Sequence, residues 1–236
     1  MIIDQTITRA IDKNLTQEQD NRDNTHISSG KLSASMLSWP LQWQILKHLK
    51  VEPKPFDLYT LRKFLRGRTV EDWLVTQMPG IVEKQKFVEY RGVVGYIDAL
   101  VDSSGYEFKE GRIVHEIKST SNAKFKNITD SNQPDPGHCL QACLYALALK
   151  TNYFAIDYVA SDDLRVTTFI LETKDYVNNV NKIIDNYDAQ LAKKEVPVFE
   201  PLYAWQKNIK YATYPEWIEL TEDEIEEKCK RLNITF

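Results

Sequence analysis

The sequence has few cysteines and no long apolar run. Its 236 residues contain three cysteines, an odd number that does not fit a secreted disulfide framework. No stretch approaches the roughly 18 apolar residues of a membrane span, and the chain does not start with a basic and then apolar signal segment. We therefore expect no membrane partner and a cytoplasmic protein.

An excess of charge of one sign is also lacking. Thirty basic side chains face 34 acidic ones, which gives a formal net charge of −4. Such a chain has no long-range positive field, so any attraction to nucleic acid has to be local. The apolar share of 42% is enough to bury a core, which excludes disorder as the overall state.

The sequence pattern divides the chain into an arm and one domain. We expect a polar N-terminal arm and linker over residues 1–30, in which Ile3, Ile7 and Ile11 are spaced for one short amphipathic helix. The domain covers 31–236 and has three parts: a helical part at 31–80, a core at 81–195, and an aromatic and acidic segment at 196–236.

Hydrophobic periodicity predicts the elements of this domain. Four-residue spacing indicates helices at 37–49, 58–78, 138–150 and 175–193. Apolar, β-branched stretches between turn signals predict strands at 81–90, 93–101, 112–119, 153–160 and 164–171. The polar stretch 122–137 is expected to be a loop. We therefore expect an α/β fold with a mixed central sheet of about five strands flanked by helices.

Two carboxylates stand in apolar strands. Asp98 interrupts the run 93–101, where a buried carboxylate costs several kcal/mol unless it is paired or bound to a cation. A buried salt bridge, or a strand end facing water, would explain it equally well. Glu116 and Lys118 share one face of the next strand, because side chains alternate along a strand. Alone, such a pair commonly decorates a wet surface.

Together these residues suggest a chemistry. Two carboxylates on adjacent strands can hold Mg²⁺ and leave positions for water and phosphate, while an ammonium group orients the water. This set suits phosphodiester hydrolysis. Glu71 is a candidate third carboxylate, although exposed glutamates on helices are common.

Four short motifs follow one another in an order that resembles a known family. They are Gly67–Glu71, Gly95–Asp98, Glu116–Lys118, and Gln141 with Tyr145. This order is similar to that of the RecB-type exonuclease branch of the PD-(D/E)XK nuclease superfamily, which includes CRISPR-associated and phage nucleases. The match spans about residues 31–220.

The resemblance implies a restriction-endonuclease-like core and a DNA nuclease that uses Mg²⁺ or Mn²⁺. It implies cleavage from an end, in end processing, recombination or repair, in a prokaryotic cell or phage-infected host. The expected metal site is made by the side chains of Glu71, Asp98 and Glu116 and the carbonyl of Ile117. Lys118 would orient the attacking water, and Gln141 and Tyr145 would contact the substrate phosphate or steady the site.

One departure concerns an iron–sulfur cluster. Many relatives hold it with four cysteines, one near the first helix and three near the C-terminus. This chain has Trp39-Pro40 and the aromatic segment 205–217 in those places. We expect no cluster, and we expect aromatic packing to tie the two regions together.

Basic residues gather just before Glu71. The stretch 47–68 holds seven lysines and arginines against two acids. We predict a DNA-binding surface there, with two more lysines in the following polar loop; the alternative is a solvated face. The predicted DNA-binding residues are Lys47, Lys50, Arg62, Lys63, Arg66, Arg68, Lys124 and Lys126.

Two other functions stay open. A degenerate nuclease fold could bind DNA or a protein without cutting, although the intact set of Asp98, Glu116 and Lys118 argues against it. An RNA-directed or sequence-specific endonuclease is the third reading. The DNA partner could be an end, a duplex or a single strand. A second copy of the chain, or a recombination or repair protein, is also left open as a partner.

Overall fold

The computed structural model describes residues 6–25, 31–210 and 212–236. In chain order the elements are α1 (Thr6–Thr25), η1 (Ala34–Met36), α2 (Leu41–His48), α3 (Leu58–Gln77), β1 (Ile81–Tyr90), β2 (Val93–Asp102), η2 (Ser103–Gly105), β3 (Arg112–Thr120), α4 (Asn122–Ser131), α5 (Pro136–Leu149), β4 (Tyr153–Ala160), β5 (Val166–Glu172), α6 (Thr173–Lys193), η3 (Ala204–Lys207), η4 (Pro215–Trp217) and α7 (Glu222–Arg231).

The strands form one mixed five-stranded sheet in the order β1-β2-β3-β4-β5. Three of the four pairings are antiparallel, and only β3 and β4 run parallel. A parallel pair needs a long crossover, which α4 and α5 supply. The predicted α/β class and mixed sheet are confirmed.

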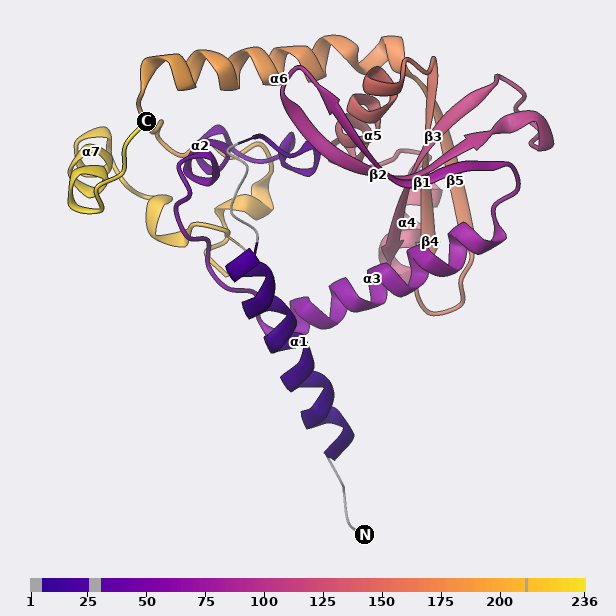
Figure 1. The fold of residues 1–236 in the computed structure, drawn as a ribbon, viewed down its shortest axis with the longest axis horizontal. Helices are drawn as coiled ribbons and strands as arrows, with labels where there is room; N and C mark the ends of the chain where they lie inside the picture. Colours follow the sequence, from indigo (N-terminus) through magenta and orange to yellow (C-terminus); the bar gives the residue numbers. More distant parts are fainter. Residues whose placement is uncertain (1–5, 26–30, 211) are drawn as a thin grey trace.

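Helices cover both faces of the sheet. On one side α5 contacts β1, β3 and β4 and packs against α6. On the other side α3 contacts β3, where its Val70 and Leu74 meet Ile117 and Val159 in a small buried cluster. Figure 1 shows α6 and α3 along opposite sides of the molecule. The sheet therefore offers two chemically separate faces to the side chains of β3.

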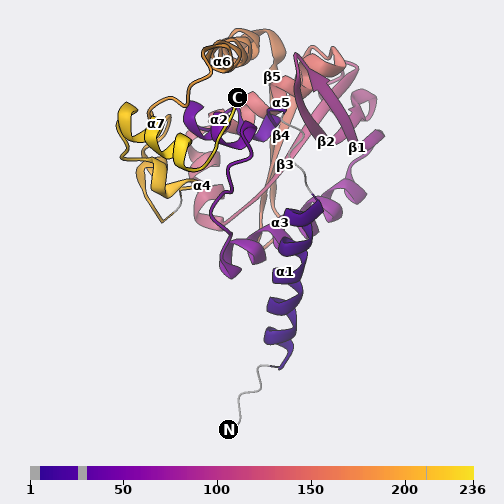
Figure 2. The ribbon, with the colours of Figure 1, turned by 60° about the vertical axis from the view of Figure 1, so that its left-hand side comes forward.

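The expected arm contains a 20-residue helix, α1. Its Leu15 is buried, and its Asp12 forms an ion pair with Arg62 of α3 at 2.5 Å. Ile7 and Ile11 are exposed, and Ile3 lies outside the described residues. Figures 1 and 2 show α1 meeting the start of α3 and projecting away from the sheet.

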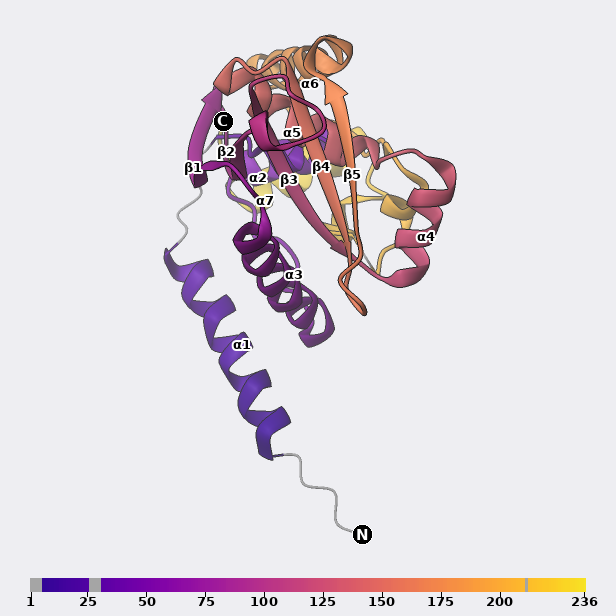
Figure 3. The same cartoon turned by 90° about the vertical axis from the view of Figure 1, so that its right-hand side faces the viewer.

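Three sequence expectations need correction. The helix expected over 37–49 starts only at Leu41, because Pro40 has no N–H and constrains the residue before it. The loop expected over 122–137 contains α4, which Ser121 caps by accepting the N–H of Lys124. The apolar spacing within 58–78 also predicts that Leu65 points inward, but Leu65 is 40% exposed. Figure 3 shows α4 beside the far end of the sheet.

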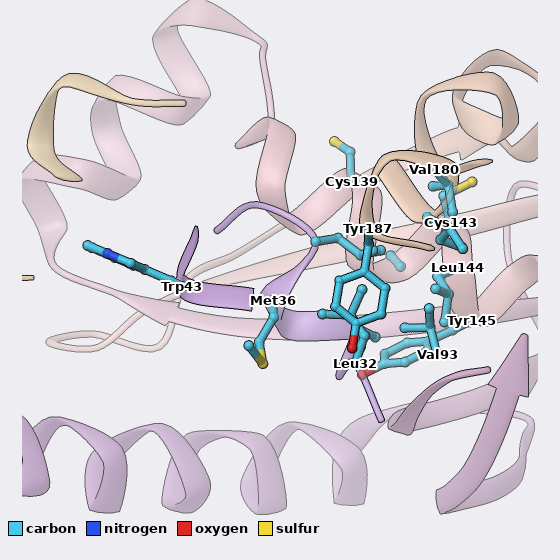
Figure 4. Packing of buried hydrophobic residues seen from close by; sticks show 14 of the residues in the cluster. Leu32, Met36, Trp43, Val93, Cys139, Cys143, Leu144, Tyr145, Val180 and Tyr187 are labelled. Atoms are coloured by element: carbon cyan, nitrogen blue, oxygen red, sulfur yellow. The ribbon is translucent and has the colours of Figure 1, made fainter. Parts of the chain in front are cut away.

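The main core lies between the sheet, α5, α6 and the N-terminal segment. Figure 4 shows Cys139 and Cys143 projecting from α5 into this region, with Val180 beside Cys143. Burial raises the pKa of Cys139 to about 11 and that of Cys143 to about 12. Both therefore act as small apolar side chains.

The C-terminal segment is tied to the region around α2. Gln42 is fully buried and donates to the carbonyls of Pro197 (3.0 Å) and Trp217 (3.3 Å). Trp43 stacks on Phe199 with ring centroids 5.5 Å apart. The expected contact between these two regions is present. The buried amide of Gln42 contributes to it as well as the aromatic rings. Across the described ranges, no helix is long and apolar enough to span a bilayer.

Candidate active site

The candidate site lies where β2 and β3 separate. Their antiparallel ladder runs from Asp102 opposite Arg112 to Ala99 opposite His115 and then ends. One residue further, the side chain of Asp98 replaces the missing strand partner, and its Oδ2 accepts the N–H of Ile117 at 2.7 Å. The space between the separating strands β2 and β3 is called the gap below. Because the N–H and C=O of a strand residue point to the same side, the carbonyl of Ile117 also faces this gap.

A chain of hydrogen bonds leads from Glu116 to α5. The Lys118 ammonium donates to Glu116 Oε1 and, at 3.4 Å, to Gln141 Oε1. Gln141 in turn donates from Nε2 to the hydroxyl of Tyr145 at 3.1 Å. The predicted pairing of Glu116 with Lys118 on one face is confirmed, as is the shared helix face of Gln141 and Tyr145.

Gly95 leaves room for Tyr145. A Cβ at Gly95 would lie 2.6 Å from the Tyr145 ring and 2.7 Å from its hydroxyl, closer than any side chain can approach. The missing side chain of Gly95 leaves the space that the Tyr145 ring occupies against β2. The glycine three residues before Asp98 therefore has a packing role.

Glu71 reaches the same gap from α3. Its Oε1 accepts a hydrogen bond from Gln85 of β1, and its carboxyl lies within hydrogen-bond reach of Asp98. The sequence did not single out Gln85, whose positive φ of 48° marks an irregular point in β1. No local sequence pattern indicated that Gln85 would contact Glu71.

Crowded carboxyls change the proton affinities of the site. Burial and the negative charge of Glu71 raise the pKa of Asp98 to about 7, although Lys118 and the Ile117 N–H oppose this. Burial and Asp98 raise the pKa of Glu116 to about 8. Burial also raises the pKa of Glu71. Burial alone would lower the pKa of Lys118, but Glu116 and Asp98 raise it, so the ammonium stays charged.

These groups fit a divalent cation on two grounds. Glu116 is 1% exposed and its Oε2 has no hydrogen-bond partner, and a buried carboxylate oxygen is costly without a donor or cation. Ionised Asp98 and Glu116 beside the one ammonium of Lys118 would also leave a negative charge, to which Glu71 adds from α3. Hard oxygen ligands are those that Mg²⁺ and Mn²⁺ prefer.

The site offers few protein ligands for a metal ion. Within the described ranges, no three His, Cys, Asp or Glu side chains converge as a ready-made metal cluster. Mg²⁺ is commonly held by one or two carboxylates together with waters. Asp98, Glu116 and the carbonyl of Ile117 would be enough for it, and whether Glu71 also binds the metal stays a prediction.

The predicted DNA-binding residues do not form one surface. Arg62 and Arg68 pair with Asp12 and Glu18 of α1, and Lys63 lies 4.2 Å over the ring of Tyr59. Arg62 lies nine residues, about 14 Å of helix, before Glu71. Arg66 is exposed on the same helix.

The remaining predicted cations lie on other elements. Lys47 lies in α2 and Lys50 just after it, and Lys50 lines a cavity with Trp217. Lys124 and Lys126 lie on α4, not on a loop. Lys124 lines a cavity with Lys118, and Lys126 lines a separate one with Arg165.

A second buried polar pair occupies the other face of β3. His115 Nδ1 lies 2.7 Å from Asp157 Oδ2, and Asp157 Oδ1 accepts the hydroxyl of Thr168 at 2.5 Å. The alternation of side chains along a strand, which predicted one face for Glu116 and Lys118, places His115 on the other face, and the structure has it there. Asp157 was missed, although it interrupts an apolar strand just as Asp98 does.

Comparisons with known proteins identify a fold. No family model and no curated protein matches the chain. SSO0001 is similar in structure at 15% identity and a TM-score of 0.56, over 89% of this chain and 96% of that chain. This likeness shows a shared fold.

Two exonuclease structures resemble the chain more weakly. An alkaline exonuclease, LHK-Exo from Laribacter hongkongensis, is 14% identical over 70% of this chain and 91% of its own, with a TM-score of 0.47. A phage-related exonuclease from Haemophilus somnus 129PT is 14% identical over 69% of this chain and 95% of its own, with a TM-score of 0.37.

Proposed function

We propose that the chain is a metal-dependent nuclease that hydrolyses DNA phosphodiester bonds, and that it acts from strand ends as a RecB-type member of the PD-(D/E)XK superfamily. The observation that carries this proposal is the convergence of Asp98, Glu116 and Lys118 in one gap, with a buried carboxylate oxygen of Glu116 left unpartnered. The end-directed mode rests on the sequence motifs alone.

Each residue has a separate task in this proposal. Asp98 and Glu116, with the carbonyl of Ile117, hold Mg²⁺ or Mn²⁺. When bound, the cation supplies positive charge for the phosphate and for an attacking water. Glu71, held by Gln85, adds negative charge to the same gap and can bind the cation directly or through water.

Lys118 acts as a donor. Because its pKa is raised, it keeps its protons at neutral pH and cannot serve as the base that deprotonates water. Its ammonium can orient the attacking water and donate to a phosphate oxygen as negative charge develops there. Gln141 holds this ammonium from α5, and Tyr145 holds Gln141, so the donor is fixed before substrate arrives.

The test compares linear DNA labelled at its ends with closed circular DNA of the same sequence. We expect release of labelled nucleotides from linear DNA with Mg²⁺ or Mn²⁺, none in EDTA, and no attack on intact circles. Cleavage of circles would replace the end-directed mode by an endonuclease mode. Binding without cleavage under every metal condition would instead support a non-cutting DNA-binding module.

A further inference from the structure

We propose that a polar cavity beside Lys118 is a subsite for one unpaired nucleotide, with Trp205 stacking on its base and Lys124 and His138 holding its phosphate. The cavity has a volume of about 320 Å³ and shares Lys118 and Gln141 with the candidate active site. Small-ligand pockets span roughly 300–1,000 Å³. This inference rests on the proposed function and specifies how that site receives its substrate.

His138 lines the cavity with a neutral ring. Burial and the positive charge of Lys118 lower the pKa of His138 to about 3. Its Nδ1 lies 2.9 Å from the hydroxyl of Tyr158, which also accepts the N–H of Asp135 at 2.9 Å. When Tyr158 donates to Nδ1, the ring carries its proton on Nε2 and can donate it to a phosphate oxygen.

Lys124 brings positive charge to this cavity. It is half exposed and lies 3.6 Å from Asp135 Oδ2, a loose ion pair. The other oxygen of Asp135 already accepts the N–H of Gly137 at the start of α5. Lys118 is paired with Glu116, so Lys124 is the ammonium group of this cavity that a phosphate would approach.

The aromatic wall comes from the C-terminal segment and is held firmly. Gln206 is fully buried, donates to the carbonyl of Ser38 at 2.9 Å, and accepts the N–H groups of Leu202 and Tyr203 at 2.7 and 3.0 Å. Figures 2 and 3 both show this gold segment beside α4. Trp205 is 52% exposed at the cavity. A half-exposed indole on an anchored backbone segment, in the same cavity as Lys124, suits a nucleobase and its phosphate.

The size of the cavity bears on whether the bound nucleotide is base-paired. A volume of about 320 Å³ holds one nucleotide but not a base pair. A strand entering here is therefore unpaired at this position, so the cavity selects single strands and frayed ends.

The test measures binding without catalysis. A fluorescent short oligothymidine is titrated by anisotropy in EDTA with the wild type, Trp205→Ala, Trp205→Phe and Phe236→Ala. Phe236 is 43% exposed and lines a different cavity, so it serves as the matched control. Stacking of one base contributes about 1–3 kcal/mol, so Trp205→Ala should weaken binding about 5- to 160-fold.

The other variants test whether an aromatic ring at Trp205 and a hydrogen-bond donor at His138 are what the ligand needs. Trp205→Phe should recover most of the affinity, Phe236→Ala should match the wild type, and affinity for blunt duplex should change little in Trp205→Ala. His138→Phe should also weaken oligothymidine binding, whereas His138→Gln, which keeps a donor, should weaken it less. Wild-type affinity in Trp205→Ala, or equal losses for single strands and duplex, would overturn the inference.

The two proposals can fail separately. If the wild type cleaves DNA with metal but Trp205→Ala binds oligothymidine normally, the subsite is wrong and the proposed function stands. If Trp205→Ala loses oligothymidine binding but no metal supports cleavage, the subsite stands and the proposed function is wrong.

Discussion

Glu116 and His115 are neighbours on β3, but their side chains lie on opposite faces of the sheet in different surroundings. His115 meets Asp157, both of whose carboxylate oxygens have partners. Glu116 meets Lys118 with one oxygen and has no partner for the other. The unpartnered atom beside Asp157 is a ring nitrogen of His115, which is less costly to bury than a carboxylate oxygen.

The difference separates a structural pair from a reactive one. Asp157 finds partners for both oxygens within the fold, in His115 and Thr168, so we expect the fold to depend on it. Glu116 and Asp98 repel each other and have raised pKa values, a feature typical of functional sites. Their arrangement is better explained by a ligand than by stability.

The largest expected effect is on the free energy of unfolding. We expect it for a change at Asp157 but not for a change at Glu116 on the opposite face of the sheet. Asp157→Ala removes a fully buried hydrogen-bond partner and should lower the free energy of unfolding by about 3 kcal/mol or more. Glu116→Gln keeps the shape and an acceptor for Lys118, and removes a carboxyl that either carries a proton or repels Asp98. Denaturant unfolding at neutral pH in EDTA should show it within about 1 kcal/mol of the wild type. Equal losses in the two variants would mean that Glu116 is also structural.

The sequence predicted the elements that carry the site but not the contacts that complete it. The consecutive antiparallel strands β1, β2 and β3 and the helix of Gln141 and Tyr145 follow from local periodicity. The alternation of side chains along β3 also places Glu116 and His115 on opposite faces. α4 was missed because only Phe125 and Ile128 of that helix are buried, which leaves a weak pattern.

The missed contacts join distant parts of the chain. Gln206 meets Ser38 across 168 positions, and Gln42 meets Trp217 across 175. A buried glutamine looks like a surface residue until both segments are placed. For the same reason the basic run of α3 gave no sign that α1 supplies acidic partners to it.

The second prediction concerns pH and metal affinity on the Glu116 face. A carboxyl with a raised pKa holds its proton below that pKa, and a metal must displace this proton. With pKa values of about 7 for Asp98 and about 8 for Glu116, Mn²⁺ affinity should rise with pH up to about pH 8. The expected rise is about tenfold per pH unit for each proton displaced, measured by calorimetry.

Two variants make this profile specific. Glu116→Gln should bind Mn²⁺ weakly and with a flatter pH profile, because one titrating ligand is gone. His115→Gln, on the opposite face, should keep the wild-type slope if it folds. An affinity that does not change with pH in the wild type would contradict the carboxylate assignment.

The smallest expected effect concerns exposed charge on α3. Changing Arg62, Lys63 and Arg66 together to Ala should flatten the slope of log affinity against log salt by up to about two to three units, since each phosphate contact contributes about −0.7 to −0.9. The ion pair of Arg62 with Asp12 reduces its share. Titrations in Ca²⁺ across a salt series measure this slope. The matched control changes Lys182, Lys193 and Lys194, which are exposed at α6 on the opposite side of the molecule. Equal slopes in the two triple variants would mean that α3 is only a solvated face.

The most direct test of the catalytic assignment is the cleavage rate of end-labelled DNA in Mg²⁺ by the wild type, Glu116→Gln and His115→Gln, each first shown to be folded by its thermal transition. The two variants alter adjacent residues on opposite faces of one strand. The account predicts that Glu116→Gln loses cleavage by about a thousandfold or more, while His115→Gln keeps activity in proportion to its folded fraction. Cleavage by folded Glu116→Gln at the wild-type rate would contradict the assignment of the active site.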